Sequence, residues 1–470
     1  MLHESFRTTL KPLSLLFALA VLFACCAWAG AQTGQVIYRF KGDTATLHDG
    51  DGPAAPLMLG NDGAFYGTTF SGGTADVCPD GQGDSFTCGT AFQLKPPAGK
   101  GLPWRERVIY SFGSRLLDGL LPENGALITD AVGDLYGTTS SGGLDITNCS
   151  ANSLPYWCGT VFQLVPPKGD GAPWTENLIY QFQTNSASDG FWPLEGLTLD
   201  KKGNLYGTTI SDGYIGDGTV FELSPPAASG EPWNETIIYY FQWPLMSDGL
   251  GPQSKLLLDD DGNLFGTTRE GGSATCVCGT VFELGPPKEN GQNWTESVLY
   301  SFQGESDGSW PNSLIRGADG SLYGTTRGDH SESCIDRQGG GYCGTVFKLS
   351  PPSAPGGFWS ETVLHNFAGG SDGAEPWGSL VSDPEGRLYG TTAFGGNGYG
   401  TVFALAPQGS SWVEKVIYSF RDKADGANPV AGLILENGNL FGTASTGGLP
   451  CANEDPLGDL PCGTVFKITK

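Results

Sequence analysis

The stretch Gly203-Asn204-Leu205-Tyr206-Gly207-Thr208-Thr209 decides the fold, together with Gly218-Thr219-Val220-Phe221-Glu222-Leu223, which follows it after a short loop. Both stretches alternate and are rich in β-branched and aromatic residues, which is typical of β-strands. The first stretch recurs with its Tyr-Gly or Phe-Gly pair at Tyr66, Tyr136, Tyr206, Phe265, Tyr323, Tyr389 and Phe441. The second recurs with its first residue at Gly89, Gly159, Gly218, Gly279, Gly344, Gly400 and Gly463. A unit that returns seven times at this length indicates a solenoid, a propeller or an array.

Each repeat carries two further signatures. One is a Trp followed by an apolar run that ends in Phe, as in Trp104 to Phe112, and a lone copy without Trp lies at Val36 to Phe40. The other is Asp-Gly-x-x-Pro, which precedes a short apolar run and begins at Asp49, Asp118, Asp189, Asp248, Asp307, Asp372 and Asp425. One repeat therefore contains four strands, which we name A (Leu-x-Leu), B (Leu-Tyr-Gly-Thr-Thr), C (Gly-Thr-Val-Phe-x-Leu) and D (Val-Ile-Tyr-x-Phe).

Four-stranded antiparallel units repeated four to eight times are the blades of a β-propeller. The seventh repeat ends after strand C, and its missing strand D is the lone copy at Val36 to Phe40. Pairing the two would remove an exposed sheet edge. We therefore predict an all-β fold, a seven-bladed β-propeller of four-stranded antiparallel blades closed by the N-terminal strand. With strand A innermost, the B–C loops and the Asp-Gly-x-x-Pro turns would share one face. The B–C loops are also the long and variable ones, so we expect function on that face.

The chain divides into a leader and one domain. Arg7 and Lys11 precede an apolar run from Leu13 to Ala24 that is too short to span a bilayer, followed by small residues suited to cleavage. We interpret 1–31 as a signal peptide and 32–470 as a single propeller domain; a lipoprotein signal ending at Cys25 is the alternative. No other segment is apolar enough for a transmembrane helix. The expected location is outside the cell, in the periplasm or at the cell surface.

The composition and net charge limit the classes of partner that we expect this protein to bind. The formal net charge is −25 and Gly numbers 73 of 470 residues. The acidic balance argues against nucleic acid and against anionic membrane surfaces as partners. We expect a monomer.

The cysteines indicate disulfides. Apart from Cys25 and Cys26, they fall in pairs within single B–C loops, and the second member directly precedes Gly-Thr. The pairs are Cys78/Cys88, Cys149/Cys158, Cys276/Cys278, Cys334/Cys343 and Cys451/Cys462. The third and sixth repeats lack both members. Such paired presence predicts a bridge in each loop, formed in an oxidising compartment. Metal binding is the rival interpretation, but it needs convergent ligands from one site.

No catalytic constellation emerges from the sequence. His365 occupies the Tyr position of a strand D and is interpreted as a packed variant, and His48 and His330 have no evident partner. We therefore predict no catalytic residue, no metal and no cofactor. The Asp-Gly-x-x-Pro aspartates are interpreted as turn residues; a ring of carboxylates near the channel mouth that attracts a cation is the alternative. Trp192, Trp310 and Trp377 flank the Pro of this motif and are the ligand-binding candidates.

The combined unit resembles the GloVer-type tandem repeat family of exported bacterial proteins. The resemblance rests on Tyr206-Gly207-Thr208-Thr209, Gly218-Thr219-Val220-Phe221, Ile238-Tyr239-Tyr240-Phe241 and Asp248-Gly249, and covers nearly all of 32–470. It implies a propeller but no established activity. The leading hypothesis is a non-catalytic module that binds carbohydrate or protein outside the cell. The alternatives are a glycan lyase or hydrolase with carboxylates near the channel, and a structural surface protein.

Overall fold

The computed structural model describes most of the chain from residue 32 onward. The described residues are 32–44, 47–74, 88–115, 117–143, 158–169, 172–183, 189–212, 217–228, 230–242, 248–273, 276–289, 292–304, 307–328, 343–354, 356–421, 425–448 and 462–469. Within these ranges the regular secondary structure consists of β-strands alone. The predicted signal peptide lies outside them.

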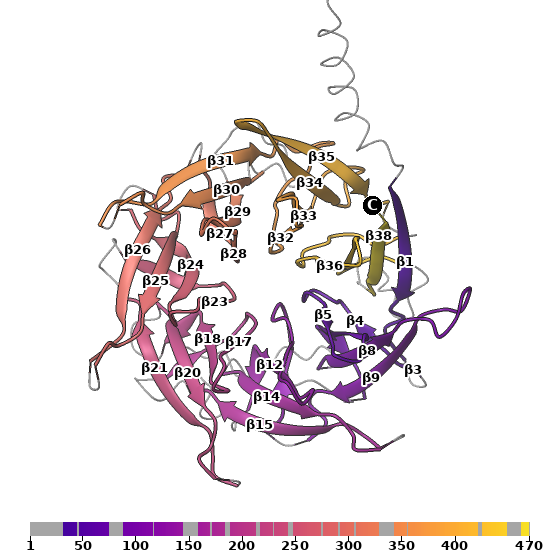
Figure 1. Ribbon diagram of the computed structural model, residues 1–470. Coiled ribbons are helices and arrows are strands. Elements are labelled where there is room, and N and C mark those ends of the chain that lie inside the picture. Colours follow the sequence, from indigo (N-terminus) through magenta and orange to yellow (C-terminus); the bar gives the residue numbers. More distant parts are fainter. Residues whose placement is uncertain are drawn as a thin grey trace, which may run out of the picture.

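Seven antiparallel sheets surround a central channel, and each uses its strands in the order A-B-C-D from the channel outward (Figure 1). The A strands are β5 (Met58–Leu59), β11 (Ile128–Thr129), β17 (Thr198–Leu199), β23 (Leu257–Leu258), β28 (Ile315–Arg316), β32 (Val381–Ser382) and β36 (Ile434–Glu436). The B strands are β6 (Phe65–Thr69), β12 (Leu135–Thr139), β18 (Leu205–Thr209), β24 (Leu264–Gly271), β29 (Leu322–Gly328), β33 (Leu388–Thr392) and β37 (Asn439–Ala444).

The outer half of each blade is equally regular. The C strands are β8 (Thr90–Lys95), β14 (Thr160–Val165), β20 (Thr219–Ser224), β25 (Thr280–Gly285), β30 (Thr345–Ser350), β34 (Thr401–Gln408) and β38 (Thr464–Thr469). The D strands are β9 (Arg105–Ser111), β15 (Thr175–Gln181), β21 (Asn234–Tyr240), β26 (Thr295–Ser301), β31 (Ser360–Asn366), β35 (Ser411–Ser419) and β1 (Thr33–Arg39). The fold is therefore the predicted seven-bladed propeller.

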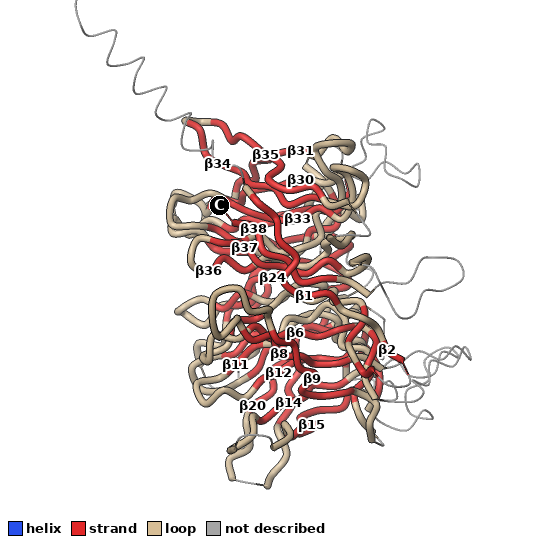
Figure 2. The backbone as a smooth tube through the Cα atoms, turned by 90° about the vertical axis from the view of Figure 1, so that its right-hand side faces the viewer, coloured by secondary structure: helices blue, strands red, loops and turns tan. Residues whose placement is uncertain are grey.

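The N-terminal strand closes the ring. Strand β1 pairs antiparallel with β38 from Thr33↔Thr469 to Arg39↔Thr464 and forms the outer strand of the seventh blade. The last blade thus combines strands from both ends of the sequence, which confirms the predicted closure. In the perpendicular view the strands cross the ring from one face to the other (Figure 2).

The Asp-Gly-x-x-Pro turns and the ends of the B strands lie on the same face. In five repeats a short strand at or just after Asp-Gly pairs with the residues that follow Thr-Thr, and in the sixth and seventh repeats the single bridges Ala374↔Phe394 and Ala427↔Thr446 take its place. The five strand pairs are β4 (Gly50–Asp51) with β7 (Ser71–Gly72), β10 (Gly119–Leu120) with β13 (Ser141–Gly142), β16 (Gly190–Phe191) with β19 (Ser211–Asp212), β22 (Gly249–Pro252) with β24, and β27 (Ser309–Pro311) with β29. A separate hairpin joins β2 (Asp43–Thr44) to β3 (Leu47–His48). The described ends of the B–C loops therefore share one face with these turns, as predicted.

Contacts that recur in the blades explain why the same residue types return at the same positions of the repeat. The second Thr of strand B bonds to the Thr of strand C inside the blade, as between Thr139 and Thr160 (Oγ1–Oγ1 2.8 Å). Gly137 lies under the Phe162 ring, and a Cβ there would come within 2.6 Å of it. A larger residue at this Gly would displace the Phe, so the Gly of Tyr-Gly-Thr-Thr is a packing requirement.

Each blade is also attached to the next by recurring contacts. The Phe that ends strand D packs edge-on against the strand C Phe of the following blade, with centroid distances such as 5.1 Å for Phe40–Phe92 and 5.0 Å for Phe420–Phe466. The first Thr of strand B donates to a carbonyl at the start of the next blade, as from Thr138 to Glu195 (3.0 Å). The two seams of the closing blade have the same Phe pairs as the others, so closure uses the ordinary blade interface.

Candidate functional site

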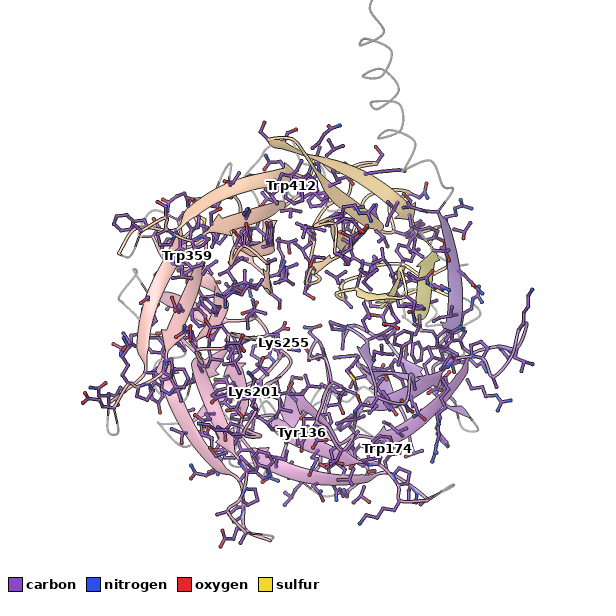
Figure 3. The ribbon with its side chains drawn as sticks, viewed as in Figure 1. Tyr136, Trp174, Lys201, Lys255, Trp359 and Trp412 are labelled. Carbon is purple, nitrogen blue, oxygen red and sulfur yellow. A yellow bond between two sulfur atoms is a disulfide. The ribbon has the colours of Figure 1, made fainter. Side chains whose placement is uncertain are left out.

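A cavity of about 670 Å³ lies in the channel on the face of the Asp-Gly-x-x-Pro turns. Its wall comes from the A strands, from the two or three residues after each Pro, and from the residue after Thr-Thr in two blades. The charged and amide side chains in this wall belong to Asn124, Glu195, Gln253, Lys255, Arg269, Asn312 and Arg327, and hydroxyl groups come from Thr129, Ser313 and Ser379. Lys255 points toward the channel (Figure 3). Burial lowers the pKa of the Lys255 ammonium.

The backbone around each Pro turns these residues toward the channel. The residue before Pro has a positive φ in every repeat, from 53° at Asn428 to 67° at Trp192, with Gly52 and Gly251 in the same region. Its N–H donates to the carbonyl of the preceding blade, as from Trp192 to Cys158 (3.0 Å) and from Trp310 to Cys278 (2.8 Å). This region is unfavourable for bulky residues, so the bond between blades holds a strained turn.

Two arginines stack on two tryptophans at one side of the cavity. The Arg327 guanidinium carbon lies 3.4 Å from the Trp377 ring centroid, and that of Arg269 lies 5.5 Å from the Trp310 centroid. Trp377 Nε1 donates to Glu375 Oε2 (3.1 Å). Burial, and then the charge of Arg269, lower the pKa of Arg327 to about 10, while Glu375 and Glu195 act in the opposite direction. Because the charge of Arg269 acts on Arg327, the two stacks form one cluster across neighbouring blades.

A glutamate pair lies beside this cluster. Burial raises the pKa of Glu195 to about 8, with Arg327 lowering it and Glu123 raising it. Burial also raises the pKa of Glu123, whose Oε1 accepts a hydrogen bond from Ser140 Oγ (2.8 Å). The cavity mouth therefore brings together cations, carboxyl groups and flat aromatic surfaces, which is the mixture that binds polar organic ligands.

The tryptophan candidates fall into two groups. Trp377 lines the cavity, and Trp310 lies against Arg269, which lines it. Trp192 shares the position of Trp310 within its repeat but is not among the described residues that line the cavity. Arg269, Arg327 and Glu195 were not among the site residues predicted from the sequence. The signal was present, because the residue after Thr-Thr varies freely between repeats whereas the Thr-Thr pair before it recurs in six of the seven.

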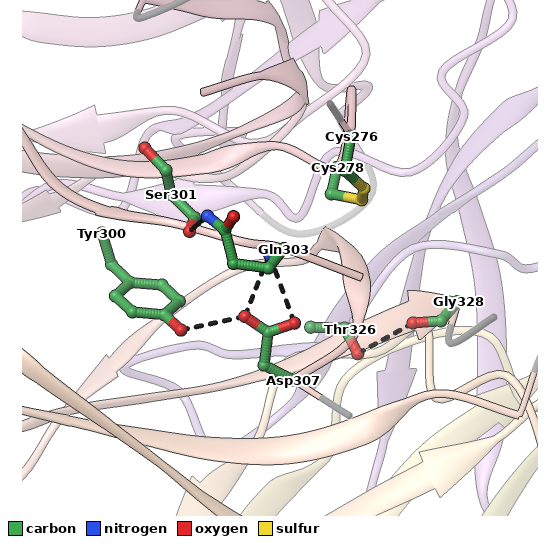
Figure 4. Close-up of a disulfide and its surroundings, with 8 residues drawn as sticks. All are labelled: Cys276, Cys278, Tyr300, Ser301, Gln303, Asp307, Thr326 and Gly328. Atoms are coloured by element: carbon green, nitrogen blue, oxygen red, sulfur yellow. Dashed lines mark hydrogen bonds between the residues drawn. A yellow bond between two sulfur atoms is a disulfide. The ribbon is translucent and has the colours of Figure 1, made fainter. Parts of the chain in front are cut away.

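The aspartates of the Asp-Gly-x-x-Pro motif form hydrogen bonds with strand D and do not face the channel. Their carboxylates accept hydrogen bonds from the strand D tyrosine and from a backbone N–H just after strand D; for Asp307 the donors are Tyr300 Oη (2.9 Å) and Gln303 N (3.0 Å) (Figure 4). The other tyrosine pairs are Tyr38–Asp49, Tyr110–Asp118, Tyr180–Asp189, Tyr239–Asp248 and Tyr418–Asp425. These contacts support the turn interpretation and place the carboxylates beside the outermost strands, away from the channel.

A repeated glutamate joins this arrangement and was missed from the sequence. It lies two residues after the Trp of strand D, at Glu106, Glu176, Glu235, Glu296, Glu361 and Glu414. Burial and the neighbouring aspartate raise the pKa of Glu106 to about 8 and that of Glu235, Glu296 and Glu361 to about 7. Six of the seven seams thus have this glutamate together with the aspartate at their outer edge, whereas β1 has Gly34 at the corresponding position. The Trp-x-Glu spacing would have revealed it.

The structure contains the Cys276–Cys278 disulfide (Figure 4). Cys158, Cys343 and Cys462 are also disulfide-bonded, and Cys149, Cys334 and Cys451, with which they were predicted to pair, lie outside the described residues, as does Cys78. Cys88 is buried. The remaining pairings stay predictions.

Peptide mapping under non-reducing conditions should find each predicted pair linked within its own loop. The expected products are one cross-linked peptide per cysteine-bearing loop, because the two members lie close in the chain and the blades keep the loops apart. The same digest after reduction and alkylation is the control. A peptide that links two different repeats would contradict the assignment.

The fold and the site define a tandem-repeat β-propeller with a polar cavity at one end of its channel. The chain belongs to the Gloeobacter/Verrucomicrobia repeat family, whose profile matches residues 20–242, 145–334 and 332–470. No curated protein matches it significantly. Among described residues, no helix has the length and hydrophobicity needed to span a membrane.

Several solved structures resemble the chain in fold. PhoX of Pseudomonas fluorescens is 11% identical, with 94% of this chain and 95% of that chain covered and a TM-score of 0.43. The aldose sugar dehydrogenase of Streptomyces coelicolor is 11% identical, with 93% and 98% covered and a TM-score of 0.38. A gluconolactonase of Xanthomonas campestris is 12% identical, with 66% and 78% covered and a TM-score of 0.33. At these values the likeness assigns no activity.

Proposed function

We propose that this protein is an exported, non-catalytic binding module that holds a carbohydrate unit at the channel mouth. The observation that carries the proposal is the pair of stacks, Arg269 on Trp310 and Arg327 on Trp377, on neighbouring blades beside one cavity. Flat aromatic and guanidinium surfaces pack against sugar rings, and the charged groups hydrogen-bond to hydroxyls.

The size and enclosure of the site support a small ligand. A cavity of about 670 Å³ lies within the range of ligand pockets. Glu195 and Asn124 offer acceptors in the same wall, so donors and acceptors face the ligand from several blades. The predicted signal peptide at 1–31 supports export, since extracellular glycans would then be within reach.

A glycan array followed by titration calorimetry on the best ligand tests this function. Trp377→Ala is expected to weaken binding by about 5- to 150-fold, because an aromatic anchor contributes about 1 to 3 kcal/mol. Trp310→Ala should weaken it in the same range. The matched control for Trp310→Ala is Trp192→Ala, which makes the same change at the same strained turn position but away from the cavity wall.

The outcomes separate a carbohydrate site from its rivals. Equal binding by wild type and Trp377→Ala would contradict the proposal. A parallel peptide array asks whether a protein segment is the ligand instead, and binding there with no bound glycan would also contradict it.

One observation favours a second candidate, an enzyme that cleaves glycans. Glu195 sits in the cavity with its pKa raised to about 8, so its carboxyl would be protonated at neutral pH and able to act as a general acid. If the protein releases products from an arrayed glycan and Glu195→Gln abolishes that release while retaining binding, the enzyme replaces the binding module as the conclusion.

A further inference from the structure

We propose that His365, Asp372 and Glu414 form a binding site for a divalent transition metal ion such as Zn²⁺. The three residues meet at the outer edge of the seam between the fifth and sixth blades. His365 is on β31, Asp372 begins the turn that follows it, and Glu414 is on β35 of the next blade. One donor atom from each residue lies within 4.8 Å of the other two.

The histidine makes this seam different from its counterparts. At the neighbouring seam Tyr300 occupies the same place and donates its hydroxyl to Asp307 (2.9 Å). Burial and the carboxylates raise the pKa of Tyr300 above its usual range, so that the phenol stays neutral and makes a poor ligand. His365 instead presents an imidazole nitrogen, 3.3 Å from Asp372 Oδ2. A nitrogen and two carboxylates then converge, which is a donor set suited to Zn²⁺.

The two carboxyl groups are poorly neutralised by the protein alone. Glu414 Oε1 is buried and has no hydrogen-bond partner among the described residues. A buried carboxylate oxygen without a partner is costly. A bound cation would neutralise both carboxylates.

The surroundings hold the ligands in place while leaving access to solvent. The Ala368 N–H donates to Asp372 Oδ2 (2.8 Å), and the His365 ring packs edge-on against Phe367 with centroids 4.8 Å apart. Such contacts orient metal ligands. The His365 and Asp372 side chains are 21% and 23% exposed, so an ion can enter from outside. Tetrahedral Zn²⁺ ligands lie about 3.4 Å from one another, close to the His365–Asp372 distance. Three protein ligands leave one position for water.

Calorimetric titration of the chelator-treated full-length protein with Zn²⁺ tests the site. Wild type is expected to bind one ion there. His365→Tyr restores the residue found at the other seams, so it should fold normally and bind at that site at least about 100-fold more weakly. His48→Ala is the control and should bind like wild type, because His48 precedes Asp49 of the first Asp-Gly-x-x-Pro turn and so belongs to a different seam from the triad.

A gain-of-function variant gives an independent readout. Tyr300→His places an imidazole beside Asp307 and Glu361, the counterparts of Asp372 and Glu414. We expect the stoichiometry to rise by one ion per chain. Zn²⁺ affinity unchanged in His365→Tyr would overturn the proposal, as would a folded wild type that binds no Zn²⁺ at millimolar concentration.

Discussion

Deletion of residues 32–42 is expected to abolish the folded monomer. The deletion removes β1 and leaves β38 as an open edge in the last blade, with the registered pairs from Thr33↔Thr469 to Arg39↔Thr464 lost. It also removes Phe40, which is completely buried and packs against Phe92 of the first blade. The combined loss is comparable with the ~5–15 kcal/mol that stabilises a typical domain. Size-exclusion chromatography and thermal melting would show aggregation through the exposed edge.

Two companion experiments separate closure from a general effect of truncation. A synthetic peptide of residues 32–42, added during refolding, should restore the monomer, because it supplies the missing strand. Phe40→Ala in the full chain should cost about 3 to 5 kcal/mol without opening the ring. A truncated protein that remains monomeric with unchanged melting would show that β1 is dispensable.

The stability of the ring should fall as the pH rises from about 5 to 8. At the seams, burial raises the pKa of Glu235, Glu296 and Glu361 from the ordinary value of 4.5 to about 7. The folded state therefore holds more protons than the unfolded state between these values. This contribution is complete below the unfolded pKa and is lost as the pH passes the folded pKa. Denaturant unfolding across this range measures it.

Replacing these glutamates by glutamine should flatten the pH dependence. The triple variant Glu235→Gln, Glu296→Gln, Glu361→Gln is expected to gain about 1 kcal/mol per site at pH 8, after allowance for solvent screening. Glu289→Gln, at an exposed position, is the control. The comparison stops at pH 5 because the pKa of Asp383 is lowered, and that group acts with the opposite sign in acid. A triple variant with the wild-type slope would rule out the seam glutamates as the cause.

The fold could be predicted because each recurring residue has the same packing role in the different repeats. The Gly of Tyr-Gly-Thr-Thr lies under a Phe, the second Thr bonds across to strand C, and the Asp of Asp-Gly binds the strand D tyrosine. Aligning the seven repeats identifies these positions, because a residue type that recurs from repeat to repeat indicates a role in the packing of the blade. The lone strand at Val36 to Phe40 was recognisable for the same reason, as a copy that lacked its blade.

The site was harder to predict because it is built from the positions that differ between copies. Arg269 and Arg327 follow Thr-Thr, and Glu195 lies two residues after Pro, at positions whose residue type differs between repeats. Their meeting depends on the curvature of the ring, which places distant residues beside one channel. Trp377 could be selected as an aromatic beside Pro, but its stacking on Arg327 required the neighbouring blade. The glutamates of the seams were visible as Trp-x-Glu, yet their burial depends on contacts between blades.

The turn before each Pro has a consequence for how such proteins diversify. Its backbone bond to the preceding blade uses only main-chain atoms, so the side chain there can change from Leu121 to Trp192 or Glu375 without altering the attachment. Each blade then behaves as an interchangeable cassette that contributes one or two side chains to a common chamber. Duplication and exchange of whole repeats can therefore produce new combinations of side chains around the cavity. The blade structure that all repeats share is kept.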